Sequence, residues 1–133
     1  MEKEIKFRAL RLDNNCFAFG YLEYNHRYNT SFIHTTIGVI DDRFVVNSET
    51  VEQFTGLQDK NGVDIYEGDI VTFKANYTNK PCGYMHAIVV IGIYELELHA
   101  KNGEIYSAND ETDEFPYAHC EIIGNILENP ELQ

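Results

Sequence analysis

The sequence predicts a mainly β protein, a small barrel or a rolled antiparallel sheet with minor helical turns. Apolar residues alternate with polar ones at a period of two, which is typical of half-buried strands. Clusters of Gly, Asn and Asp separate these runs, as they do at tight turns. Nothing linker-like divides the 133 residues, so we expect one domain, 1–133.

The first half of the chain predicts a hairpin, two further strands and one short helical turn. Asp13-Asn14-Asn15 has the chemistry of a turn, whereas the segment 25–31 is polar and loop-like. Asn47 or Ser48 is expected to cap the helical turn, which would carry Val51 and Phe54. The strands are expected over residues 5–10, 16–24, 32–40 and 43–46.

The second half predicts two turns close together, Asp59–Gly62 and Tyr66–Asp69, followed by longer strands. Gly92 lies inside the longest apolar run and indicates a bulge or a tight connection. The acidic segment 107–116 is expected to be a solvated loop. The strand residues are Val63, Ile65, Ile70, Val71 and Phe73, with further strands over 85–100 and 104–108 and a short one within 120–132.

The charge balance excludes some partners. Ten Lys and Arg against 22 Asp and Glu give a formal net charge of −12, which disfavours direct binding to DNA or RNA. The excess suits solubility, repulsion from anionic membranes or a basic protein partner. Apolar runs are too short for a membrane helix, and the N-terminus lacks a signal core, so we expect a cytoplasmic protein.

Three widely spaced cysteines, Cys16, Cys82 and Cys120, do not form a disulfide framework, and we interpret them as reduced, mostly buried thiols. A zinc site would need Cys82 and His86 to meet His119 and Cys120. Adjacent ligands point to opposite faces of a strand, so this site is disfavoured.

The stretch TGLQDKNGVDIYEGDIV, residues 55–71, has the density of polar groups that a functional loop needs. A calcium loop that begins at Asp59 fails because Val63, Asp64 and Ile70 occupy positions that require other residues. No Gly-Lys-Ser/Thr follows, so it is not a phosphate loop. We interpret the stretch as two turns that direct strands into a sheet.

Signals for catalysis are weak. No nucleophile elbow surrounds any cysteine, and the pair Glu95 and Glu97 would lie on the solvated face of a strand. The Tyr-rich segment 21–28, with Tyr77 and Tyr84, suggests either a recognition surface or ordinary packing at a barrel rim, and we favour packing.

Three blocks, IKFRAL (5–10), ETVEQFTGLQDKNGVDIYEGDIV (49–71) and CEIIGNILENPEL (120–132), make the chain resemble the YopX-like proteins of bacteriophages and prophages. The resemblance implies a phage- or prophage-encoded protein, a mainly β fold with a barrel-like C-terminal part, and homo-oligomers. It carries over no catalytic residues, because the family's biochemical function is not established.

We therefore predict a single YopX-like domain, with a hairpin region over 1–48 and a barrel-like region over 49–133. We expect a non-catalytic accessory protein of the bacterial cytoplasm that acts through self-assembly or protein–protein binding, without catalytic residues, cofactor or metal. Two alternatives stay open: an acidic DNA-mimic decoy that binds a host nucleic-acid-binding protein, and a small-molecule enzyme. The decoy would use the acidic loop Asp110, Glu111, Asp113 and Glu114, and the structural signature comprises Thr55, Gly56, Leu57, Asp59, Asn61, Gly62, Ile65, Tyr66, Glu67, Gly68 and Asp69.

Overall fold

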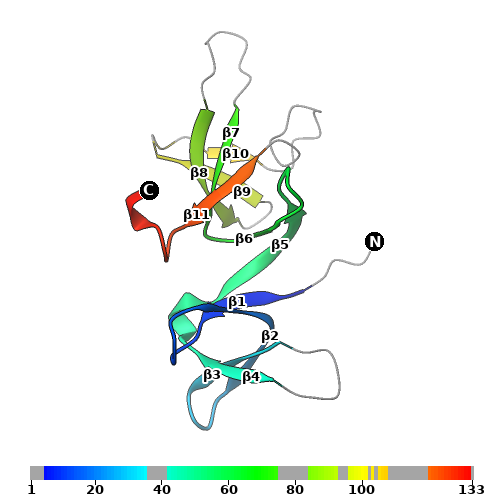
Figure 1. The fold of residues 1–133 in the computed structure, drawn as a ribbon, viewed down its shortest axis with the longest axis vertical. Helices are drawn as coiled ribbons and strands as arrows, with labels where there is room; N and C mark the ends of the chain where they lie inside the picture. The colour runs from blue at the N-terminus through cyan, green and yellow to red at the C-terminus, as the bar shows by residue number, and fades with distance from the viewer. Residues whose placement is uncertain are drawn as a thin grey trace. The chain divides into compact units, whose positions relative to one another are not determined.

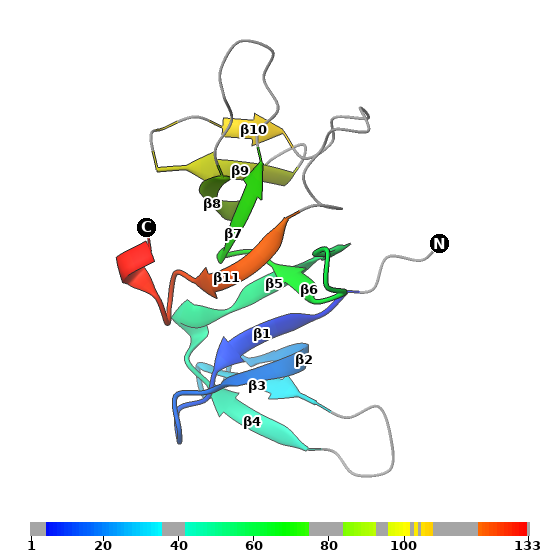
Figure 2. The same cartoon turned by 45° about the horizontal axis from the view of Figure 1, so that its top comes forward.

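The computed structural model describes residues 5–35, 42–74, 84–92, 96–101, 103, 105–107 and 120–132. Within these ranges the chain forms β-strands and two short 3-10 turns, so the predicted class is confirmed (Figures 1 and 2). The elements are β1 (Phe7–Leu10), β2 (Phe17–Asn25), β3 (Thr30–His34), β4 (Arg43–Val46), η1 (Ser48–Thr50), β5 (Glu52–Gln58), β6 (Asp64–Tyr66), β7 (Asp69–Lys74), β8 (Tyr84–Ile91), β9 (Leu96–Ala100), β10 (Ile105–Ser107), β11 (Glu121–Asn125) and η3 (Pro130–Leu132).

The strands form two antiparallel sheets, and the described parts of neither sheet close into a barrel. One sheet has the order β4-β3-β2-β1-β5-β6 and the other β10-β9-β8-β7-β11. The chain divides into two compact units, residues 1–54 and 55–133, and β5 crosses the boundary. Whether residues 1–133 behave as a single domain, with the predicted division at 48/49, stays a prediction.

The first unit is a meander whose last strand returns to its first. The predicted N-terminal hairpin is confirmed by the pairing of β1 with β2, and β3 and β4 follow in chain order. The end of β4 then meets the end of β1, because Arg11 bridges Val46 and the Asn47 N–H donates to the Leu10 carbonyl at 2.8 Å. Small and branched side chains fill the resulting core: Ala9, Ala18, Ile33 and Val46, with Phe7, Phe44 and Val51 packed against them.

Gly20 is required where β2 passes β3. Its φ is +152°, and a Cβ built there would lie 2.0 Å from the His34 carbonyl oxygen. No side chain fits at that distance, so the close approach of the two backbones depends on glycine.

One prediction about the first unit needs correction. The helical turn is present and Asn47 caps it by accepting a hydrogen bond from the Glu49 N–H, but Val51 and Phe54 are wrongly placed on it. The turn ends at Thr50 and the chain is extended from there, because Phe54 belongs to β5. Of the thiols expected to be mostly buried, Cys120 is buried, whereas Cys16 is exposed because it lies in the turn between β1 and β2.

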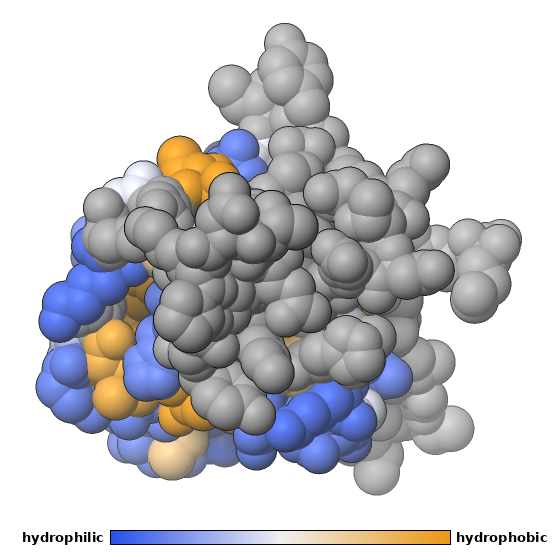
Figure 3. All heavy atoms as spheres, turned by 90° about the horizontal axis from the view of Figure 1, so that it is seen from above, coloured by the Kyte–Doolittle hydropathy of each residue, from blue (hydrophilic) through white to orange (hydrophobic). Residues whose placement is uncertain are grey.

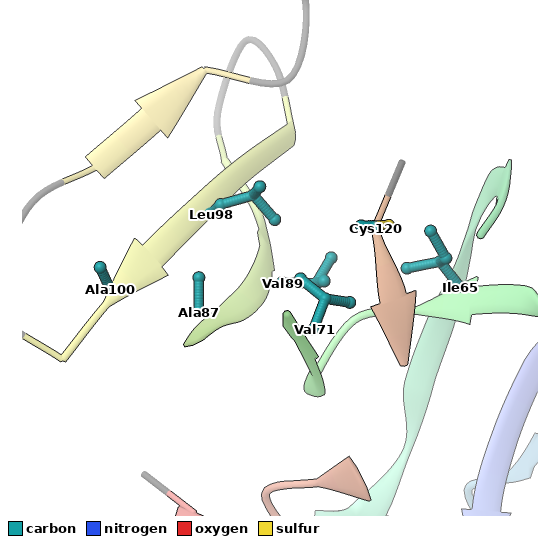
Figure 4. Close-up of a cluster of buried hydrophobic side chains, with 7 residues drawn as sticks. All are labelled: Ile65, Val71, Ala87, Val89, Leu98, Ala100 and Cys120. Carbon is teal, nitrogen blue, oxygen red and sulfur yellow. The ribbon is translucent and has the colours of Figure 1, made fainter. Parts of the chain in front are cut away.

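The second unit packs one face of its five-stranded sheet into a larger core. Side chains from β6, β7, β8 and β9 meet there with Cys120, which precedes β11 (Figure 4). The strand signal over 85–100 divides into β8, which ends at Ile91, and β9, which begins at Leu96, and the two strands pair antiparallel. Of the two roles predicted for Gly92, a bulge or a tight connection, the structure supports the connection, because Gly92 lies just after β8. The core residues are Ile65, Val71, Ala87, Val89, Leu98, Ala100 and Cys120.

The exposed surface of the described residues carries both hydrophilic and hydrophobic side chains. On the side shown in Figure 3, the described residues are mostly hydrophilic, with hydrophobic residues in separate spots. In the described ranges, no helix has the length and apolar character that crossing a membrane requires.

Candidate functional site

The predicted signature residues all lie in the second unit, along β5, β6, the first residue of β7 and the two turns between them. Both predicted turns are present. The Gly62 N–H donates to the Asp59 carbonyl at 3.0 Å, and the Tyr66 N–H donates to Asp69 Oδ2 at 2.8 Å. Gly62, with φ +79°, takes the left-handed conformation that closes the first turn.

Asp59 is the organising residue of the first turn. Its side chain is buried, and Oδ1 accepts hydrogen bonds from the N–H groups of Asn61 at 2.9 Å and Val63 at 3.0 Å. Oδ2 accepts from the Ile122 N–H at 3.1 Å, 63 positions along the chain. The carboxylate therefore both shapes its own loop and fastens that loop to β11, so these contacts assign it a structural role.

The second turn is a similar junction. The Asp69 side chain is buried beneath it, the Gly68 N–H donates to the Val89 carbonyl at 2.8 Å, and the Ile126 N–H donates to the Gly68 carbonyl at 2.9 Å. One turn thus connects β8 with the segment that follows β11. Signature residues that contact distant strands through the backbone specify the fold of this unit.

The environment of Cys120 does not support a nucleophilic role for this thiol. Burial of the side chain, and then the nearby carboxylates of Asp59 and Asp69, raise the pKa of Cys120 from 9.0 to about 11. A thiol with that pKa is protonated near neutral pH, whereas nucleophilic attack needs the thiolate. The environment of Cys120 is that of a core residue.

The remaining predicted site residues lie partly outside the described ranges. In the part of the chain that the structure describes, no three His, Cys, Asp or Glu side chains gather as metal ligands. Several residues of the predicted sites lie outside the described residues. They are Cys82 and His119 of the zinc hypothesis, Glu95 of the carboxylate pair, Tyr77, and Asp110, Glu111, Asp113 and Glu114 of the acidic loop.

The first unit carries a surface that the signature did not indicate. In an antiparallel sheet, directly paired residues share a face. The pairs Tyr21 with His34 and Phe32 with Val45 therefore place their side chains opposite the core residues Ala18 and Ile33. We call the part of this face on β2, β3 and β4 the outer face, and it comprises Phe17, Phe19, Tyr21, Glu23, Phe32, His34, Arg43 and Val45.

Large apolar side chains are exposed on the outer face. The exposed fractions of Phe19, Tyr21 and Val45 are 48%, 47% and 43%, and the ring of Phe17 lies 6.0 Å from that of Phe19. Scattered apolar residues are ordinary on protein surfaces, but here Phe19 and Tyr21 on β2 share one face of the sheet with Val45 on β4, and Phe32 of β3 lies between the two strands. Exposed apolar side chains gathered on one face are typical of binding sites.

A small charged group lies among these aromatics. Glu23 Oε1 is 2.5 Å from His34 Nε2 and 3.9 Å from Arg43 Nη1. The Arg43 guanidinium also lies 4.4 Å from the centre of the Phe32 ring, a cation–π distance. Because Glu23 is shared and the nearest Arg43 nitrogen is 3.9 Å away, the half-exposed guanidinium retains donors for a further carboxylate.

The Tyr-rich segment predicted as either packing or recognition divides between two surfaces. Tyr21 points to the outer face, whereas Tyr24 lies at the end of β2, next to the turn that joins β2 to β3. The missed signal was the pattern on all three strands together, because the outer face emerges only when β2, β3 and β4 are placed in register.

Comparison with known proteins identifies the family. A solved structure described as "Crystal structure of protein EF1440 from Enterococcus faecalis" matches 98% of this chain and 99% of its own, with 20% sequence identity and a TM-score of 0.54, a likeness of fold. No curated protein matches. The family model described as YopX protein matches residues 6–133, so the chain belongs to the YopX family.

Proposed function

We propose that this chain is a non-catalytic association protein, and that its first unit binds a second copy of itself through the outer face. The exposed apolar side chains of Phe19 and Tyr21 on β2 and of Val45 on β4, all on the same face of the sheet, carry this proposal. Burial of apolar surface is the main driving force of protein association. A phage or prophage origin and action in the bacterial cytoplasm remain predictions from the family resemblance.

The charges of the outer face favour a two-fold arrangement. A two-fold axis brings the same patch of both subunits together, so a patch must complement itself. The outer face carries both Arg43 and Glu23, and each Arg43 can therefore approach Glu23 of the second copy.

The distribution of net charge favours the same unit. Residues 1–54 hold six Lys and Arg against eight Asp and Glu, a formal charge of −2, whereas residues 55–133 hold four against 14, a charge of −10. Two copies that meet through their first units therefore repel each other less than two copies that meet through their second units.

The size of the face sets the expected strength. The outer face is three strands wide, at about 4.8 Å per strand, and about seven residues long, at about 3.3 Å per residue. Its projected area is therefore roughly 300 Å². A standard interface buries about 800 Å² per partner, so we expect self-association in the micromolar range.

Light scattering over a concentration series of about 5 to 500 μM tests the proposal. We expect Tyr21→Thr, which keeps a β-branched residue in β2, to weaken self-association about tenfold. Ile105→Thr is the matched control, because Ile105 is 58% exposed on β10 of the second unit. Arg43→Glu and Glu23→Arg should each weaken association, and the double variant should restore it. A monomer at every concentration, or self-association unchanged by Tyr21→Thr, would refute the proposal.

The concentration of negative charge in the second unit favours one further candidate, the DNA-mimic decoy. It would bind a basic host protein through Asp110, Glu111, Asp113 and Glu114. Changing these four residues to Asn and Gln should then abolish capture of DNA-binding proteins at low salt, and captured proteins that are not displaced by DNA would count against it.

A further inference from the structure

The hairpin between β2 and β3 ends in a tip held in one shape by its own side chains. We call residues 24–29 the hairpin tip. Asn25 Oδ1 accepts hydrogen bonds from the N–H groups of Arg27 at 3.0 Å and Tyr28 at 3.3 Å. Asn29 adopts a left-handed φ of 51° and its side chain bonds to the Tyr24 hydroxyl. These bonds reduce the conformational entropy that the tip would lose on binding.

The side chains on the hairpin tip are of the types that dominate binding energy at protein interfaces. Tyr28 is 68% exposed and Tyr24 42% exposed. The Arg27 guanidinium lies 5.7 Å from the centre of the Tyr28 ring, and the rings of Tyr24 and His26 meet edge to face at 4.6 Å. Tyr and Arg are enriched among hot-spot residues, and Tyr gives a large contact area with few rotatable bonds.

The hairpin tip also has a charge opposite to that of the chain. The chain has a formal charge of −12, yet residues 24–35 contain no Asp or Glu, and Arg27 is a permanent positive charge among them. The nearest preceding carboxylate, Glu23, is engaged by His34 and Arg43 at the base of the hairpin.

We infer that the hairpin tip inserts into a groove of a different protein, and that carboxylates at the rim of this groove pair with Arg27. Nucleic acid is a poorer occupant, because binding to phosphates requires several cations and the tip offers one. A second copy is not the partner in this inference, because the proposed function assigns self-association to the outer face, and the test below distinguishes the two.

Capture followed by a direct affinity measurement tests this inference. The full chain is immobilised and exposed to nuclease-treated lysate of Enterococcus faecalis, the organism of the similar solved structure. Arg27→Ala and Tyr28→Ser are compared with Lys101→Ala, which removes one exposed positive charge in the second unit. A protein that the wild type and Lys101→Ala retain and both tip variants lose is then purified. We expect its Kd to rise at least tenfold for each tip variant, to change less than twofold for Lys101→Ala, and to rise with salt.

Other outcomes overturn the inference. One is retention that does not distinguish the tip variants from Lys101→Ala. Another is tip-dependent retention that occurs only in lysate without nuclease treatment, and the third is tip-dependent retention of the chain itself. Thermal unfolding shows whether the variants are folded. If Tyr28→Ser is destabilised, the two single variants Tyr28→Ala and Arg27→Ala are compared with the wild type instead. Tyr21→Thr should keep the captured protein while it weakens self-association, so failure here is distinguishable from failure of the proposed function.

Discussion

Replacing Asp59 with Ala removes the acceptor of three backbone N–H groups at once, those of Asn61, Val63 and Ile122. Asn at the same position keeps one oxygen but presents an amide nitrogen in place of the other. In the orientation that preserves the loop bonds, this nitrogen would face the Ile122 N–H, and two donors repel. Asp59→Ala should therefore destabilise the second unit more than Asp59→Asn.

The magnitude follows from the contacts. A hydrogen bond to a charged group contributes about 1.5–3 kcal/mol to stability. The Asn61 amide lies at the loop and can bond to water instead, so mainly the bonds from Val63 and Ile122 count. We expect a loss of about 3–5 kcal/mol for Asp59→Ala and about 2 kcal/mol for Asp59→Asn. With a urea m-value of about 1 kcal/mol/M, the midpoint for Asp59→Ala should fall by about 3–5 M.

Urea unfolding followed by circular dichroism measures the loss, and hydrogen–deuterium exchange locates it. The Ile122 amide should lose protection although it is 63 positions from the substitution. Asp64→Asn is the matched control, because Asp64 lies in the same hairpin and accepts from the exposed Gln58 side chain at 3.1 Å. An unchanged urea midpoint for Asp59→Ala, or an Ile122 amide that stays protected, would refute the structural role.

Three further predictions concern strain, a buried ion pair and pH. Gly62→Val should destabilise the fold by about 1–3 kcal/mol through backbone strain alone, since nothing lies within 4 Å of a Cβ built at this position. Gly20→Ala should abolish folding of the first unit, because the new Cβ has no space. Thermal unfolding of the two variants compares these effects. Arg8 and Glu52 form a buried ion pair at 2.9 Å, so Arg8→Ala should cost about 3–5 kcal/mol, and a Met/Leu pair at the two positions should recover most of it in urea unfolding. The pKa of the Cys120 thiol is raised from 9.0 to about 11, so the contribution of the protonated thiol to stability is complete below pH 9 and falls by about 2 kcal/mol by pH 11. Cys120→Ala should remove that part of the pH dependence of the unfolding free energy. Equal slopes of unfolding free energy against pH in the wild type and the variant would contradict this prediction.

Features with local causes could be predicted from the sequence. The turns at Asp59–Gly62 and Tyr66–Asp69 were predictable because Asp, Asn and Gly favour particular backbone conformations wherever they occur. Asn47 was predictable as a cap for the same reason. The alternation of apolar residues identified most strands, because that pattern follows from the geometry of a single strand.

Features that depend on strand pairing could not be predicted. The burial of Arg8 is one example, because it depends on Glu52, 44 positions away. The link between Asp59 and Ile122 likewise joins distant segments. Tyr21 and Tyr24 belong to one Tyr-rich segment, and only the register of β2 with β3 assigns Tyr21 to the outer face. Sequence patterns report faces, whereas contacts across a sheet require the register.

The link from Asp59 to Ile122 also bears on how the chain folds during synthesis. The described strand pairs of the first unit lie within residues 7–54, so they can form soon after this segment leaves the ribosome. The Asp59 loop must wait for Ile122, 63 residues later, which at roughly 5–20 residues per second takes about 3–13 s. During that interval the middle of the chain is an incomplete hairpin with apolar strands exposed. Chaperone binding and aggregation of the nascent protein should therefore concentrate on residues 55–74.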